Sequence, residues 1–158
     1  KEVSDSIKVI NMRLEHVYGP EDNVHKFIPK MIVALIYKKK SLELTRGTQK
    51  RDFIYINDVV YAFNLVIKKN KIIKNGFTEY EIGWGNTHTI RSLLGSLQKL
   101  TGNFTTKLEF GKIPFNKNEI NSSCANNQEI KKLGWNPKIS LERGLQLTVK
   151  YYKNLLNE

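Results

Sequence analysis

Apolar and polar residues recur with the period of a strand in some segments of the chain and with the period of a helix in others. Residues 7–14 have the apolar pattern of a buried strand. Apolar side chains recur at helical spacing in residues 27–37, 59–67, 90–100 and 141–156, and a shorter helix is indicated at residues 126–133. Short apolar or β-branched runs predict further strands at residues 42–44, 53–56, 80–82 and 107–110. The alternation of strands and helices predicts an α/β fold.

Residues with capping chemistry mark the ends of these predicted helices. Asn57 and Asp58 follow a strand-like run, and their side-chain oxygens suit the first free amides of the next helix. Thr89 and Ser140 stand in the corresponding place before two later helices. Gly102 is placed where a helix ends in a left-handed turn. No internal repeat or linker separates the elements, so residues 1–158 are expected to form a single domain.

The composition is that of an ordinary soluble domain, with 40% hydrophobic and 26% charged residues. The longest apolar stretch, residues 31–37, is too short to cross a bilayer, and no signal peptide is visible. Cys124 is the only cysteine, which excludes an internal disulfide and fits a reducing compartment. We therefore expect a cytoplasmic protein without a membrane partner.

The formal net charge of +11 favours anionic partners, which include phosphorylated metabolites and nucleic acids. The lysines are scattered over residues 38–40, 68–74 and 131–132, and they are not interleaved with aromatic residues on one stripe. Such runs are typical of a solvated surface, so nucleic acid is not the expected partner. A basic module that binds nucleic acid or an anionic glycan without turnover is the alternative.

Three sequence motifs occur in a fixed order. Residues 13–20 read Arg-Leu-Glu-His-Val-Tyr-Gly-Pro, and residues 47–58 contain Gly47 followed by Arg51-Asp52-Phe53-Ile54-Tyr55-Ile56 and Asp58. Residues 133–137 read Leu-Gly-Trp-Asn-Pro and precede the last predicted helix. Together these motifs resemble the C-terminal half of the extended short-chain dehydrogenases/reductases, the family of nucleotide-sugar epimerases, dehydratases and reductases.

The resemblance implies a fold and a chemistry. The fold is the C-terminal portion of an NAD(P)-binding Rossmann-type enzyme, with its last parallel strands and a small mixed α/β substrate-binding subdomain. The implied substrate is a nucleotide-diphosphate-sugar for surface polysaccharides, and the implied cofactor is NAD or NADP, with Leu14 beside the nicotinamide.

Two signatures of the family's N-terminal half do not occur in this sequence. It has no Gly-x-x-Gly-x-x-Gly fingerprint and no Tyr-x-x-x-Lys. We therefore expect that the dinucleotide-binding half is absent, that no catalytic residue lies in this chain and that the chain alone is inactive. An unpaired sheet edge would then favour self-association, so a homo-oligomer is a further prediction.

Arg51 is the strongest candidate for contact with the substrate. A guanidinium presents a planar fork of donors that matches two phosphate oxygens, and the resemblance implies that Arg51 grips the diphosphate. The alternative is an ion pair with Asp52 or another carboxylate. His16 stands where many relatives have an asparagine that touches the phosphates, and the alternative is a structural histidine. The pair Glu15–His16 resembles the branch that makes CDP-linked 3,6-dideoxyhexoses, such as the abequose and paratose synthases.

The resemblance places five further residues near the substrate. Lys26 and Phe27 open a helix whose free amides attract phosphate oxygens, although Phe27 has a place in the core as its alternative. Leu42 and Leu44 correspond to the edge that holds the base, where Leu44 replaces a residue that is often aromatic. Asn116 stands where a second arginine is usual, which weakens the second phosphate clamp.

Other reactive side chains form no recognisable site. The three histidines and Cys124 lack metal-ligand spacing, so no metal site is expected. Asp52 and Asp58 are interpreted as structural caps rather than as an acid–base pair. One variant distinguishes the two functional hypotheses. In a nucleotide-sugar enzyme, Arg51→Ala should abolish binding of a nucleotide diphosphate. In a nucleic-acid module it removes one charge among many and should change the affinity only accordingly.

Overall fold

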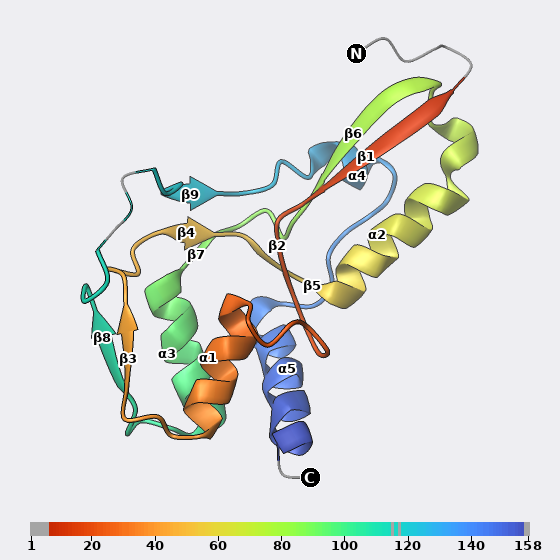
Figure 1. Cartoon of the computed structure of the whole chain (residues 1–158). Coiled ribbons are helices and arrows are strands. Elements are labelled where there is room, and N and C mark those ends of the chain that lie inside the picture. Colours follow the sequence, from red (N-terminus) through yellow and green to blue (C-terminus); the bar gives the residue numbers. More distant parts are fainter. Residues whose placement is uncertain (1–6, 115, 117, 157–158) are drawn as a thin grey trace.

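A computed structural model describes residues 7–114, 116 and 118–156. The helices are α1 (Phe27–Ile36), α2 (Ile56–Lys68), α3 (Ile90–Thr101), α4 (Gln128–Lys132) and α5 (Leu141–Leu156), with a 3-10 turn η1 (Asn70–Ile72) (Figure 1). The strands are β1 (Lys8–Leu14), β2 (His16–Tyr18), β3 (Ser41–Leu44), β4 (Lys50–Arg51), β5 (Phe53–Tyr55), β6 (Gly76–Ile82), β7 (His88–Thr89), β8 (Lys107–Phe110) and β9 (Ser122–Ser123). Within the described ranges, no helix combines the length and hydropathy that a membrane span requires. The predicted α/β fold is confirmed.

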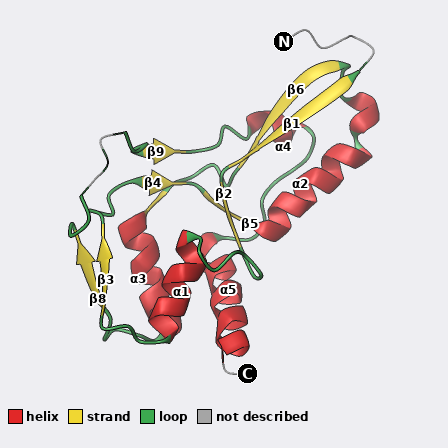
Figure 2. Ribbon diagram, in the orientation of Figure 1, coloured by secondary structure: helices red, strands yellow, loops and turns green. Residues whose placement is uncertain are grey.

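The longest strands, β1 and β6, form a parallel ribbon of seven residues each, with Leu14 opposite Ile82 at their carboxyl ends. Helix α2 runs beside this ribbon (Figure 2). Val59 and Ala62 of α2 are buried in a hydrophobic core that also contains Tyr80 and Ile82 of β6. Burial of each large apolar side chain contributes on the order of 1.5–3 kcal/mol to folding, so this core fixes α2 against the ribbon.

A second core lies where α1, α3 and α5 pack together (Figure 1). Its fully buried side chains come from all three helices and from β2: Ile32, Leu35, Leu93, Leu94, Leu97, Leu145 and Tyr152, together with Tyr18. The capping prediction for α3 is confirmed, because Thr89 Oγ1 accepts the N–H of Ser92 at 3.0 Å. Gly102 ends this helix with a φ of 74°, a left-handed conformation that glycine adopts without a steric penalty.

Short strands connect the two cores. Strand β2 pairs in parallel with β5, so that His16 lies opposite Phe53 and Tyr18 opposite Tyr55. Strand β3 pairs in parallel with β8, and β4 lies between β7 and β9. Strands β2, β4, β7 and β9 have only two or three residues each and were not predicted from the sequence; β5 is as short as β2, but it lies in a longer aromatic and β-branched run.

The strand expected at residues 80–82 is confirmed but is longer than predicted: β6 begins at Gly76, because it follows the full length of β1 in register. The capping prediction for α2 was wrong. Asn57 and Asp58 do not cap α2, whose N-cap is Tyr55 without a side-chain hydrogen bond. Instead the carboxylate of Asp58 accepts the backbone N–H groups of Lys138 and Ile139 at 3.0 and 2.9 Å, so it ties α2 to the segment before α5.

Gly144 of α5 lies where an added side chain should measurably lower the stability of the fold. A Cβ at this position would overlap the hydroxyl of Tyr18 and lie 2.9 Å from both Tyr18 Cζ and Tyr55 Cδ2. We expect Gly144→Ala to lower the free energy of unfolding by about 1–3 kcal/mol, which corresponds to roughly 3–10 °C in melting temperature. Thermal denaturation followed by circular dichroism measures the shift.

Gly95 of α3 provides the matched control for this substitution. Nothing lies within 4 Å of a Cβ built at Gly95, which is also helical. Gly95→Ala is expected to keep or raise the melting temperature, because alanine favours a helix by up to about 1 kcal/mol over glycine. Equal losses in both variants would contradict the close packing of α5 on Tyr18 and Tyr55.

Candidate substrate site

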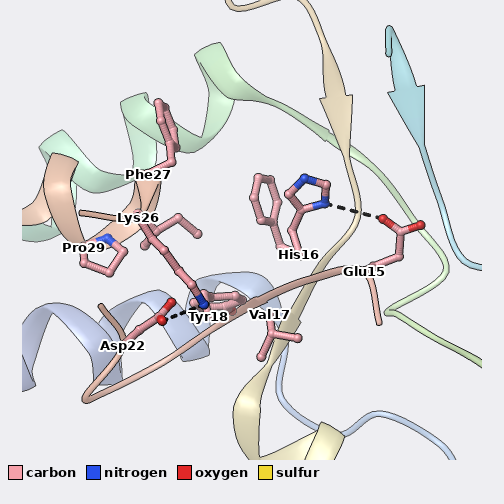
Figure 3. A pocket seen from close by; sticks show the side chains of 10 residues that line it. Glu15, His16, Val17, Tyr18, Asp22, Lys26, Phe27 and Pro29 are labelled. Atoms are coloured by element: carbon pink, nitrogen blue, oxygen red, sulfur yellow. Dashed lines mark ion pairs between the residues drawn. The ribbon is translucent and has the colours of Figure 1, made fainter. Parts of the chain in front are cut away.

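A cavity of about 370 Å³ opens beside β2, just after the carboxyl end of β1. It is lined by the segment from Glu15 to Tyr18, by Phe53 and by the start of α1 (Figure 3). Three of the candidates named from the sequence, His16, Lys26 and Phe27, therefore meet in one place. In open α/β sheets, ligands bind in crevices outside the carboxyl ends of the strands, and this cavity has that location.

The pairing of β2 with β5 positions His16 in the cavity wall. The backbone N–H of His16 donates to the carbonyl of Asp52 at 3.1 Å, and its ring meets the Phe53 ring edge-on with centroids 5.8 Å apart. At the other end of β2, the buried Tyr18 hydroxyl donates to the carbonyl of Leu141 at 3.2 Å. Burial raises the pKa of Tyr18, so this hydroxyl remains a donor. The wall is anchored at both ends.

The start of α1 forms the opposite wall. Lys26 is the N-cap residue, and its Nζ lies 2.8 Å from Asp22 Oδ1 (Figure 3). Phe27 is 39% exposed and so does not belong to the hydrophobic core. The first amides of a helix have no intrahelical acceptor and carry a partial positive charge. Together with Lys26 they make this wall suitable for an anion.

Arg51 lies outside the lining of this cavity and has a carboxylate partner. Its Nη2 is 3.2 Å from Glu119 Oε1, and its Nη1 donates to the carbonyl of Lys50 at 2.9 Å. The partner is Glu119 rather than the neighbouring Asp52. Gln49 donates to the same Glu119 oxygen at 3.1 Å, so the guanidinium is held in a polar network while only 12% of its side chain is exposed.

The remaining candidates lie apart from the cavity. Leu42 and Leu44 are on β3, where they pair with Leu108 and Phe110 of β8. Leu44 is buried in the helical core, whereas Asn116 is exposed. Leu14 ends β1 directly before the cavity and is 45% exposed, so an apolar surface adjoins the site there.

Asp52 has a structural role beneath the site. Its buried carboxylate accepts the backbone N–H groups of Trp84, Gly85 and Ala125 at 2.8, 2.9 and 3.2 Å. Burial raises the pKa of this carboxyl group, although the three N–H donors oppose that shift. Desolvation and the nearby carboxylates of Asp52 and Glu15 also raise the pKa of the Cys124 thiol, which disfavours the nucleophilic thiolate.

Sequence reasoning assigned no binding role to Glu15 and did not identify Glu119 as the partner of Arg51. Glu15 lines the cavity and lies beside His16, and Glu119 pairs with Arg51. Only the adjacency of Glu15 and His16 was visible in the sequence, whereas the Glu119 contact spans 68 positions. Over the part of the chain that the structure describes, no three His, Cys, Asp or Glu side chains are grouped to hold a metal ion.

Comparisons with known proteins agree with this architecture. A CDP-abequose synthase of Salmonella typhimurium is 39% identical over 145 residues, which cover 91% of this chain and 48% of that protein. UDP-glucose 4-epimerase of Thermotoga maritima, solved with UDP-glucose, superposes with a TM-score of 0.82 at 27% identity, over 96% of this chain and 48% of that one. A dTDP-glucose 4,6-dehydratase of Bacillus anthracis, solved with NAD, gives a TM-score of 0.78 at 27% identity, over 92% and 44%.

The chain thus spans about half the length of the curated relatives that it matches. Residues 2–83 match the model of the NAD dependent epimerase/dehydratase family. This match covers half of the chain and includes both the cavity wall around His16 and the strand that carries Arg51. The chain belongs to the NAD-dependent epimerase/dehydratase family.

Proposed function

We propose that the chain is the substrate-binding part of an NAD-dependent nucleotide-sugar epimerase, dehydratase or reductase, and that its cavity holds the diphosphate of the nucleotide-sugar. The observation that carries this proposal is the meeting of His16, Lys26 and the first turn of α1 around one cavity. Phe27 and Ile28 in that turn have backbone N–H groups without an intrahelical acceptor. Imidazole, ammonium and amide groups all donate hydrogen bonds to phosphate oxygens. Fixing the diphosphate places the sugar, and fixed geometry alone removes up to about 7–11 kcal/mol of a reaction barrier.

The nucleotide cofactor would be held largely by residues that this sequence does not contain, since it has no glycine-rich phosphate loop. The exposed, apolar Leu14 at the carboxyl end of β1 fits the face of a nicotinamide ring. When bound, NAD supplies hydride transfer at a sugar carbon. The residues described here bind and orient the substrate and supply no proton-transfer group.

A dinucleotide-binding half would dock against the free side of β1. Among the described strands, β1 pairs only with β6, so its other edge has unpaired backbone groups. Three apolar side chains of α2, the helix that runs beside the β1–β6 ribbon, are also exposed: Val60, Phe63 and Ile67. We propose that a parallel strand and its helix from that half cover this surface, and that the chain self-associates through it when that half is missing.

The likeness to CDP-abequose synthase supports a finer proposal about the substrate. We propose that the whole enzyme acts in the cytoplasm on a CDP-linked sugar destined for a surface polysaccharide. The Glu15–His16 pair in the cavity wall is the feature of this chain that accompanies that likeness.

Lys26 tests the location of the diphosphate. We expect the chain to bind CDP-glucose or UDP-glucose in titration calorimetry, and Lys26→Ala to weaken that binding by about fivefold. The loss is modest because the Lys26 side chain is 60% exposed and solvent screens its charge. Lys30→Ala, one helical turn further along α1, is the matched control and should leave the affinity unchanged.

Two outcomes would contradict the proposal. The first is no binding of either nucleotide-sugar by the wild-type chain. The second is an equal effect of the Lys26 and Lys30 substitutions, which would assign the affinity to net charge rather than to the cavity.

A further inference from the structure

Glu15 places a fixed negative charge in the cavity wall. The Oγ of Ser123 lies 2.8 Å from each of the two carboxylate oxygens of Glu15. The backbone N–H of Glu15 donates to the carbonyl of Ile82 at 2.9 Å. Only 16% of the Glu15 side chain is exposed. These contacts prevent the carboxylate from turning away into solvent.

This carboxylate faces one edge of the His16 imidazole. Nδ1 of His16 lies 3.5 Å from Oε2 of Glu15, and Figure 3 shows the ring with this nitrogen turned toward the carboxylate. Phe53 packs against the ring and limits its rotation. No partner for Nε2 is found among the residues that the structure describes, so this nitrogen is available to a ligand in the cavity.

The arrangement restricts which form of His16 can bind a phosphate. A neutral imidazole carries one proton. If the proton is on Nε2, the lone pair of Nδ1 faces the Glu15 carboxylate and is repelled. If the proton is on Nδ1, Nε2 presents a lone pair to the phosphate oxygen and is also repelled. Only the imidazolium donates at both nitrogens, to Glu15 on one side and to a phosphate on the other.

We propose that His16 binds the substrate diphosphate only as the imidazolium, that Glu15 is the positioning residue that enforces this form, and that substrate binding takes up one proton from solution. The proposal rests on the proposed function, because it requires a diphosphate in this cavity. The buffer acid loses the proton and becomes its conjugate base, and the proton forms an N–H bond on the free imidazole nitrogen; no other bond forms or breaks.

The other charged groups around the cavity are already engaged. Lys26 is paired with Asp22 at the start of α1. Asp52, on the segment before β5, is buried and accepts three backbone N–H groups, and burial raises its pKa. Histidine is the side chain whose charge normally changes near neutral pH, so His16 is the group that we expect to gain the proton.

The test is titration calorimetry of the chain with CDP-glucose and UDP-glucose at pH 7 and pH 8. Each diphosphate is esterified at both ends, so the ligand itself does not titrate in this range. Repeating each titration in buffers of different ionisation enthalpy counts the protons taken up. For the wild-type chain we expect uptake to approach one proton at the higher pH, and the affinity to fall by up to about tenfold per pH unit.

Three variants separate positioning from a structural role. His16→Asn should bind without proton uptake and with an affinity independent of pH, because an amide donates without being charged. Glu15→Gln removes the repulsion from neutral His16, so uptake should fall below about half a proton while the melting temperature stays close to that of the wild type. The control is His25→Asn, which replaces an exposed histidine directly before Lys26. This variant should retain full proton uptake.

The outcomes distinguish this inference from the proposed function. Binding by the wild-type chain without proton uptake, or full uptake in Glu15→Gln, overturns the role of Glu15 and leaves the substrate site standing. Absence of wild-type binding to both nucleotide-sugars overturns the substrate site and this inference with it. The ring ¹⁵N signals of His16 give an independent check, since both nitrogens should be protonated in the bound state.

Discussion

Arg51→Ala is expected to weaken binding of CDP-glucose or UDP-glucose by at least about a hundredfold. We propose that the Arg51 guanidinium leaves Glu119 when substrate binds and donates two hydrogen bonds to the diphosphate. Hydrogen bonds to charged groups contribute about 1.5–3 kcal/mol each, and two of them correspond to two or more powers of ten in the dissociation constant. Titration calorimetry at a fixed salt concentration measures the loss.

The Glu119 contact makes this prediction specific. Because the Arg51 fork is paired at 3.2 Å in the free chain, Glu119→Gln should release it and tighten nucleotide-sugar binding. Arg143→Ala removes the same charge from the exposed face of α5 and should leave the affinity within about twofold, as expected for an exposed charge. Equal losses in Arg51→Ala and Arg143→Ala, with a steep dependence on salt, would instead favour a basic module that binds polyanions.

Asp52→Ala is expected to have the largest effect on stability. It leaves three backbone donors without their acceptor: those of the buried Ala125, the half-buried Trp84 and the exposed Gly85. Hydrogen bonds to a charged group contribute about 1.5–3 kcal/mol each, and water can replace the acceptor only at the exposed Gly85, so the free energy of unfolding should fall by about 3 kcal/mol or more. In a chain of this size the melting temperature should drop by about 10 °C or more, which differential scanning calorimetry measures.

Two further substitutions separate this role of Asp52 from a simple loss of charge. Asp52→Asn keeps one acceptor oxygen but directs an amide NH2 toward backbone N–H groups that need an acceptor, so it should also be strongly destabilising. Glu129→Ala removes a carboxylate whose side chain is 62% exposed and paired with Lys132, and it should cost no more than about 1 kcal/mol. Comparable losses for Asp52→Ala and Glu129→Ala would contradict the buried network.

Helices with a strong apolar period were predictable from local sequence. Thr89, Gly102 and the leucines of α3 each favour the same helix, and Ser140 caps α5 by accepting the N–H of Arg143 at 3.3 Å. Only residues 80–82 of β6 were predicted, because residues 76–79 join the strand through pairing with β1 and not through a local pattern. The sequence pattern thus predicted the elements that are stabilised by their own apolar period and caps.

Polar contacts across the fold were not predictable in the same way. Asp58 has the sequence position of a helix cap, yet it binds the segment before α5, some 80 positions away. Arg51 was expected to bind either a phosphate or a carboxylate, and in the free chain it forms an ion pair with the carboxylate of Glu119. Such partners depend on which loops the fold brings together. The local pattern of a single sequence does not show which loops these are.

A crystal structure of the chain with CDP-glucose or UDP-glucose tests the central claim most directly. The account predicts the diphosphate in the cavity beside β2, within hydrogen-bond distance of His16 and Lys26, with the Arg51 guanidinium turned from Glu119 onto a phosphate oxygen. A nucleotide bound elsewhere, with Arg51 still paired to Glu119 and the cavity empty of ligand, would contradict it.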